Sequence, residues 1–221
     1  MIHSKYELEA PMSTLNKIAY YQNQRNEIPN QMLAKELAET SNREGIREIA
    51  ENLWNKNKNI SSDCLKVLYE IGYIKPELIE DYMYDFIKLL HSKENRMVWG
   101  AMIGLATIAD RRAGEIWAHL DDVLAVIEHG SVITVVAGIK TLAKVATAGE
   151  KFREKIFPFL LQQLEICIPR DVPTHAESML CAVDKKNKEG FLSVLDMRRP
   201  ELSPTQLTRI KKVYKKAQAL S

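Results

Sequence analysis

Apolar residues recur along the chain at helical spacing, and apolar and polar residues do not alternate strictly over several positions, as they would in a half-buried strand. Helical segments are separated by short joints in which glycine, proline, serine and asparagine gather. Short joints make consecutive helices pack antiparallel. The pattern therefore predicts an all-α protein of roughly twelve helices.

One phrase of this pattern returns at a fixed distance. LATIA at residues 105–109 is followed 37 positions later by LAKVA at 142–146, and the weaker LYEIG at 68–72 lies 37 positions earlier. Sliding the sequence on itself by 37 residues aligns apolar residues in both helices of each pair. The first helix gives Leu65, Met102 and Ile139, then Leu68, Leu105 and Leu142, then Ile71, Ile108 and Val145; the second gives Met83, Leu120 and Phe157, then Phe86, Val123 and Leu160.

The apolar register continues across the loop between the two helices, so each helix pair is one structural unit. Its helices bury one face against each other and another face against the next pair. We expect a single domain over residues 1–221, folded as a right-handed α-α superhelix. Residues 1–60 hold the N-terminal helices and a degenerate repeat, 61–167 hold three regular repeats, and 168–221 hold a degenerate repeat and a capping helix. Ser203 and Pro204 predict the start of that last helix.

This spacing of leucine, valine and alanine in helix pairs resembles the HEAT and armadillo class of alpha-solenoids over residues 28 to 198. The resemblance implies that the first helix of each pair lines a concave binding surface. Within this class, the chain distantly resembles the HEAT-like alkylpurine DNA glycosylases, which hold damaged DNA in a basic groove with tryptophans and an aspartate. That family places the aspartate one helical turn after a tryptophan; after Trp99 the position is Ile103, which cannot stabilise a developing positive charge.

A candidate binding face can be drawn on the first helices of the three regular repeats. Basic and aromatic side chains fall on one flank of these helices and could contact phosphates and stack on bases. The competing interpretation is that the tyrosines pack between repeats, that the lysines are ordinary solvated positions, and that Asp110 pairs with an arginine or caps the next helix. The candidates are Lys66, Tyr69, Tyr73, Arg96, Trp99, Asp110, Lys140 and Lys144.

Charge is distributed unevenly along the chain. The formal net charge is only +2, but residues 1–139 carry 15 basic and 20 acidic side chains, whereas residues 140–221 carry 16 and 9. The last helix presents Arg209, Lys211, Lys212, Lys215 and Lys216 away from its apolar side. This pattern fits a solvated capping helix, and the alternative is a helix that meets a membrane surface or nucleic acid.

Other chemistry is sparse. Cys64, Cys167 and Cys181 are widely spaced within apolar helical patterns, where a free thiol behaves as a small hydrophobic residue. The HxE fragment at His175 and Glu177 lacks the PCxxC that zinc deaminases need, so no metal or cofactor is expected. With no signal-like segment, these features favour a cytoplasmic protein without a membrane partner.

The sequence thus predicts a non-enzymatic binding scaffold that uses the concave face of a HEAT-like solenoid, most simply for a protein partner. The alternative is a nucleic-acid-binding protein related to the DNA-repair solenoids, with catalysis altered or absent.

Overall fold

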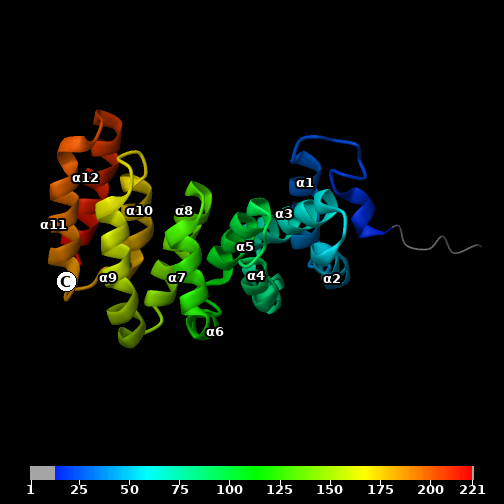
Figure 1. The fold of residues 1–221 in the computed structure, drawn as a ribbon, viewed down its shortest axis with the longest axis horizontal. Helices are drawn as coiled ribbons and strands as arrows, with labels where there is room; N and C mark the ends of the chain where they lie inside the picture. The colour runs from blue at the N-terminus through cyan, green and yellow to red at the C-terminus, as the bar shows by residue number, and fades with distance from the viewer. Residues whose placement is uncertain (1–12, 221) are drawn as a thin grey trace, which may run out of the picture. The chain divides into compact units, whose positions relative to one another are not determined.

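The computed structural model describes residues 13–220, and over that range the chain is built from twelve α-helices and six short 3-10 helices, without a strand (Figure 1). The prediction of an all-α fold with about twelve helices is confirmed. The chain divides into two compact units, residues 1–79 and 80–221, and each is described by itself. The single continuous domain stays a prediction.

Over residues 13–79, the first unit contains three α-helices. Its elements are η1 Thr14–Lys17, α1 Ile28–Thr40, α2 Arg43–Glu51, η2 Asn52–Trp54, α3 Lys58–Ile74 and η3 Pro76–Leu78.

The second unit contains nine α-helices in the part of the chain that the structure describes. Its elements are η4 Glu80–Tyr82, α4 Met83–Leu89, α5 Asn95–Ile108, α6 Ala113–Ala118, α7 Leu120–His129, α8 Val132–Ala146, α9 Glu150–Ile166, α10 Val172–Met179, η5 Leu180–Ala182, α11 Lys188–Arg198, η6 Arg199–Glu201 and α12 Pro204–Gln218.

The predicted 37-residue period appears in where the helices begin. Helices α3, α5 and α8 start at Lys58, Asn95 and Val132, so successive starts are 37 residues apart. The aligned residues Leu65, Met102 and Ile139 are each at most 1% exposed. The second helix of the central repeat differs from the expectation of one unbroken helix, because the chain ends α6 at Ala118 and starts α7 at Leu120.

A buried polar network links α1 to α3 in the first unit. Asn30 is fully buried; its Oδ1 accepts a hydrogen bond from the backbone N–H of Ala19 at 2.8 Å, and its Nδ2 donates to Asp63 at 2.9 Å. The other carboxylate oxygen of Asp63 accepts from the backbone N–H of Tyr20 at 2.8 Å. Because buried polar groups are costly without partners, this network fixes the turn before α1 against α3.

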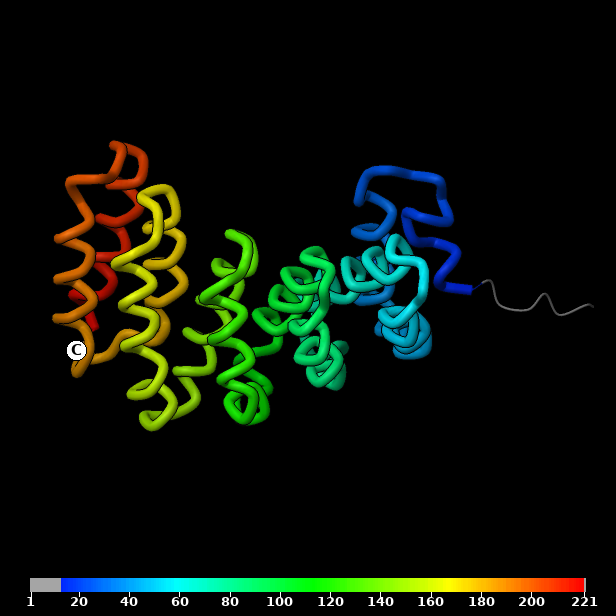
Figure 2. Tube along the Cα trace, in the orientation of Figure 1, coloured from blue at the N-terminus to red at the C-terminus, as the bar shows by residue number. Residues whose placement is uncertain are grey.

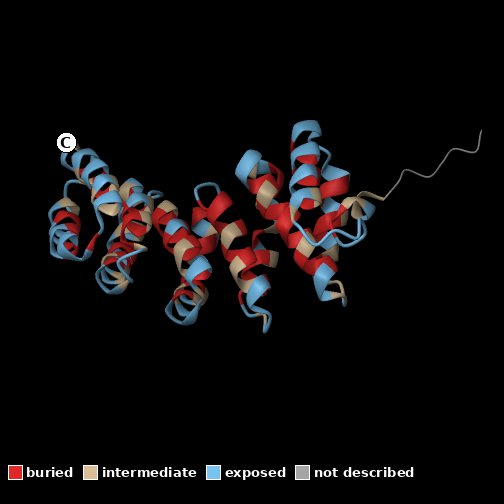
Figure 3. Ribbon diagram, turned by 90° about the horizontal axis from the view of Figure 1, so that it is seen from above, coloured by how far each residue is buried: buried red, intermediate tan, exposed pale blue. Residues whose placement is uncertain are grey.

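The second unit is built of two helix layers. Helices α5, α8, α10 and α12 contact one another in that order and form a first layer, while α4, α6, α7, α9 and α11 pack behind them. In Figures 1 and 2 the helices from α8 to α12 stand side by side, and Figure 3 shows buried residues where helices face one another, with exposed ones on the outside. Each helix of the first layer therefore turns one flank away from the second layer.

The start of α12 confirms the sequence prediction. Ser203 is the N-cap, its hydroxyl accepts a hydrogen bond from the backbone N–H of Gln206, and the Gln206 side chain accepts one from the backbone N–H of Ser203. Pro204 occupies the first helical position, where a missing N–H has no cost. The register of α12 is thereby fixed, and with it the direction of its basic side chains.

Candidate functional site

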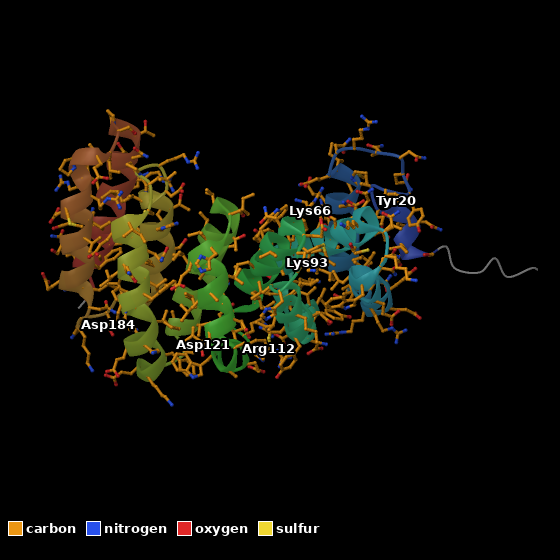
Figure 4. The ribbon with its side chains drawn as sticks, viewed as in Figure 1. Tyr20, Lys66, Lys93, Arg112, Asp121 and Asp184 are labelled. Atoms are coloured by element: carbon orange, nitrogen blue, oxygen red, sulfur yellow. The ribbon has the colours of Figure 1, made fainter. Side chains whose placement is uncertain are left out.

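In the first unit, the structure places three of the predicted site residues together on α3, but the Lys66 ammonium already pairs with carboxylates of the chain. The Lys66 side chain is labelled in Figure 4. Its ammonium nitrogen lies 2.8 Å from Glu27, 2.7 Å from Glu70 and 4.9 Å from the centre of the Tyr69 ring. Burial opposes the charge, but the hydrogen bonds to both carboxylates outweigh it and raise the pKa of Lys66 above its ordinary value.

The two tyrosines beside Lys66 differ in exposure. Tyr69 is buried and Tyr73 is 55% exposed, with their rings packed edge to face at 6.2 Å between centres. A lysine that two carboxylates already neutralise has little charge left for a phosphate. The placement of Lys66 therefore favours a structural role, and Tyr73 is the accessible member of this group.

In the second unit, helix α5 offers one accessible strip. From Met97 to Ile108, only Val98, Trp99 and Ile103 are partly exposed and the other residues are buried. Trp99 and Ile103 lie on the same flank as the exposed Arg96. Helix α8 repeats this spacing, because Ile133, Val136 and Lys140 remain accessible 37 positions later. Since α5 and α8 pack against each other within the first layer, the two strips lie next to each other.

Asp110 forms an ion pair with Lys144 of α8, at 3.2 Å. The predicted pairing of Asp110 with an arginine, or its use as a cap, is wrong. Arg111 instead contacts Glu80, and Arg112, labelled in Figure 4, pairs with Asp81 at 2.7 Å and Glu115 at 3.0 Å. The two guanidinium groups pair with carboxylates of residues 80, 81 and 115, and Asp110 pairs with Lys144 in α8, the next helix of the first layer.

Lys140 and Lys144 lie one turn apart on α8. Partial burial lowers the pKa of Lys140, and the nearby ammonium of Lys144 adds to the shift. Two cations at this spacing repel each other, and the carboxylate of Asp110 bonds to Lys144. An additional negative charge at this end of the α8 strip would therefore lower the repulsion between the two ammonium groups.

Helices α10 and α12 continue the accessible strips of α5 and α8, which the repeat spacing did not predict. Arg209 of α12 donates to both carboxylate oxygens of Glu177, at 2.9 and 2.6 Å, and to the Thr174 hydroxyl at 3.1 Å. These hydrogen bonds lower the pKa of Glu177, and the ammonium groups of Lys212 and Lys216 add to the effect. Arg209, Lys212 and Lys216 thus share the flank of α12 that faces α10.

We call the accessible strips of these four helices the first-layer face. It comprises Arg96, Trp99, Ile103, Ile133, Val136, Lys140, Lys144, Thr174, Glu177, Cys181, Arg209, Lys212 and Lys216. The sequence analysis named part of it on α5 and α8. It missed the α10 and α12 parts because the spacing from Thr174 to Arg209 is 35 residues rather than 37, although the basic flank of α12 was readable from helical periodicity.

The cysteines offer no activated nucleophile. Burial and the carboxylates of Asp63 and Glu48 raise the pKa of Cys64 to about 12, and partial burial of the sulfur atoms raises the pKa of Cys167 and Cys181. The expectation that all three pack as small hydrophobic residues is wrong for Cys181, which is exposed in η5, directly after α10. Across residues 13–220 no group of histidine, cysteine and carboxylate side chains could hold a metal ion.

His175, from the HxE fragment, is buried in α10 and neither ring nitrogen has a hydrogen-bond partner in the described chain. Burial lowers the pKa of His175, and the carboxylate of Asp171 offsets only part of the shift. Below the ordinary histidine pKa of about 6.5, the unfolded chain binds a proton that the folded protein does not, so stability falls as the pH drops. The neutral ring is therefore a core residue with a pH-dependent cost.

Between about pH 7 and about pH 5.5, we expect the free energy of unfolding to fall by about 1 kcal/mol more in the wild type than in a His175→Met variant. Urea unfolding followed by circular dichroism at each pH measures this difference. The control His129→Gln, at the exposed end of α7, should keep the wild-type pH dependence. Identical curves for His175→Met and the wild type would show that His175 takes up its proton in the folded state.

Within the described residues no helix is long and apolar enough to cross a bilayer. No protein-family model and no curated protein matches the sequence. The chain is, however, similar in structure to repeat proteins. A designed armadillo repeat protein in complex with the peptide (KR)4 superposes with a TM-score of 0.69 at 12% identity, over 92% of this chain and 96% of that one.

Two further solved structures give the same result. An engineered protein of the Northeast Structural Genomics Consortium has a TM-score of 0.62 at 14% identity, over 94% of this chain and 98% of its own. A mutant of Kap121p has a TM-score of 0.66 at 15% identity and covers 95% of this chain, which matches 23% of Kap121p. The fold is a HEAT- or armadillo-type alpha-solenoid. The predicted resemblance to this class is confirmed at the level of fold, and nothing in these similarities supports the glycosylase relationship.

Proposed function

We propose that this solenoid is a non-enzymatic scaffold whose first-layer face binds an extended segment of a partner protein. The observation that carries the proposal is the set of adjacent strips on α5, α8, α10 and α12, which mix basic and apolar side chains outside the core. Neighbouring helices of one layer present such strips as a continuous surface without a deep pocket, which suits an extended chain better than a small substrate.

The apolar members of the face support a protein partner over a nucleic acid. Ile133 is 49% exposed, and Ile103 and Val136 are partly exposed on the same flank. Aliphatic side chains gain by excluding water with other apolar groups, and they make no hydrogen bond to phosphate. Nucleic-acid binding remains the second candidate, because residues 204–220 carry five basic side chains and no acidic one.

Selection from a random peptide library on the immobilised protein tests the proposal. We expect enriched peptides whose affinity falls by about tenfold or more when Ile133→Asp puts a charge into the apolar part of the face. The matched control is Ile166→Asp, which changes an isoleucine of 66% exposure at the end of α9, in the other layer, and should alter affinity less than about twofold. Failure to enrich any peptide, or equal losses in both variants, would refute the proposal.

A further inference from the structure

The basic residues of the first-layer face form one connected region over α8, α10 and α12. The α8 end is anchored where Lys144 meets Asp110 at 3.2 Å, and the α12 end where Arg209 meets Glu177 at 2.6 Å. Cys181 lies between them: partial burial raises the pKa of its thiol, and the nearby ammonium of Lys144 acts against that shift. Since Cys181 is one helical turn beyond Glu177, the two ends belong to one surface.

Cations outnumber carboxylates in this region. Lys144, Arg209, Lys212 and Lys216 provide four positive charges, whereas the two carboxylates of Asp110 and Glu177 pair with Lys144 and Arg209. Neither Lys212 nor Lys216 lies within ion-pair distance of a carboxylate of residues 13–220. The excess positive charge gives the region an electrostatic preference for an anionic ligand.

We propose that the segment bound by the first-layer face is acidic, with carboxylates placed on Lys140, Lys144, Lys212 and Lys216 and apolar side chains placed on Ile133 and Val136. This inference rests on the proposed function and adds the chemistry of the partner. The designed armadillo protein of similar fold was solved with a basic peptide, (KR)4. The first-layer face of this chain carries an excess of positive charge, which favours an acidic segment instead.

Neighbouring charges of the region support this assignment. Lys140 and Lys144 repel each other, so a carboxylate between them would relieve a cost that the protein now bears. The apolar strip of α8 continues directly into its basic end, from Ile133 through Val136 to Lys140. An acidic peptide with interspersed leucines matches both ends, whereas a nucleic acid matches only the basic one.

The length of the probe follows from the geometry of packed helices. Neighbouring helix axes lie about 8–10 Å apart and an extended chain spans about 3.3 Å per residue, so about twelve residues cross α8, α10 and α12 with some to spare. The probe is a fluorescein-labelled peptide of that length in which Asp and Glu alternate with Leu. Fluorescence anisotropy measures its binding to the full chain over a salt series.

Helix α12 supplies a matched pair of variants. Lys212→Glu with Lys216→Glu reverses the charge of the flank that faces α10. Lys211→Glu with Lys215→Glu reverses the charge of the other flank, which carries Leu207 and Tyr214 and faces Arg199. Both doubles change the net charge equally. We expect the first to weaken peptide binding by about tenfold or more and the second by less than about threefold at physiological salt.

Circular dichroism tests whether both double variants remain helical. If the first does not fold, the double variant Lys212→Gln with Lys216→Gln replaces it, and we expect that variant to weaken binding by about threefold or more. Equal losses in the two glutamate doubles would mean attraction by net charge alone and would overturn the inference. So would tighter binding of a labelled DNA duplex with the same dependence on Lys212 and Lys216. If library peptides depend on Ile133 but are not acidic, the scaffold function stands and the acidic partner is wrong.

Discussion

Replacing Arg198 with methionine is expected to lower the free energy of unfolding by about 3 kcal/mol. The Arg198 side chain is 5% exposed and donates to the backbone carbonyl groups of Leu164 at 2.8 Å, Glu165 at 2.5 Å and Cys167 at 2.6 Å. It also pairs with Glu201 at 2.9 Å. These carbonyls end α9, where the helix itself provides no donors, so a methionine of similar volume leaves them without partners.

Urea unfolding followed by circular dichroism measures the loss. The control is Arg199→Met, one position later, where the guanidinium is 49% exposed and pairs with Asp196 at 3.2 Å. Because exposed ion pairs contribute little, this variant should change the free energy of unfolding by less than about 1 kcal/mol. A loss of similar size in both variants would mean that Arg198 does not cap α9 in solution.

Introducing valine at Gly138 is expected to cost about 3 kcal/mol, mainly through overpacking between α7 and α8. A Cβ atom at Gly138 would come within 2.4 Å of Cγ1 and 2.6 Å of Cδ1 of Ile127. Ile127 is 1% exposed and has no room to retreat. The glycine therefore allows α8 to approach α7 more closely than any side chain would.

A second substitution separates this contact from the general effect of valine in a helix. Ile127→Ala removes the atoms in the way, so the double variant should be more stable than the sum of the two single losses by at least about 1 kcal/mol. Gly114→Val in α6 is the control, since nothing lies within 4 Å of a Cβ there, and its effect should stay within about 0.5 kcal/mol. Additive losses at Gly138 and Ile127 would contradict the close approach.

The sequence predicted helix positions and buried residues correctly where apolar periodicity alone determines them. Apolar periodicity placed the starts of α3, α5 and α8 and the buried residues Leu65 and Met102, because a helix pair must bury the same face in every repeat. It did not predict the break between α6 and α7 at His119, since the apolar phase continues through that position. Local backbone breaks of this kind leave no trace in the hydrophobic pattern.

The candidate site was harder to predict because it depends on which charges pair across helices. Lys66 and Asp110 both lie on accessible flanks by helical geometry, yet the structure joins Lys66 to Glu27 and Glu70, and Asp110 to Lys144. Glu70 lies one turn from Lys66 on α3 and can be found from helical spacing, whereas Glu27 and Lys144 lie more than thirty residues from their partners and cannot be found from periodicity within a single helix. The contribution of Arg96 and Trp99 to binding stays a prediction, as does that of Tyr73.

The most direct test of the acidic partner is to find which lysines touch it. A carbodiimide joins a carboxylate to an amine only when the two are in contact, and mass spectrometry identifies the lysine. With the Asp, Glu and Leu peptide bound, we expect coupling at Lys140, Lys144, Lys212 and Lys216, and the lowered pKa of Lys140 leaves more of its amine free to react. Coupling concentrated at Lys211 and Lys215, or spread evenly over exposed lysines of both layers, would contradict it.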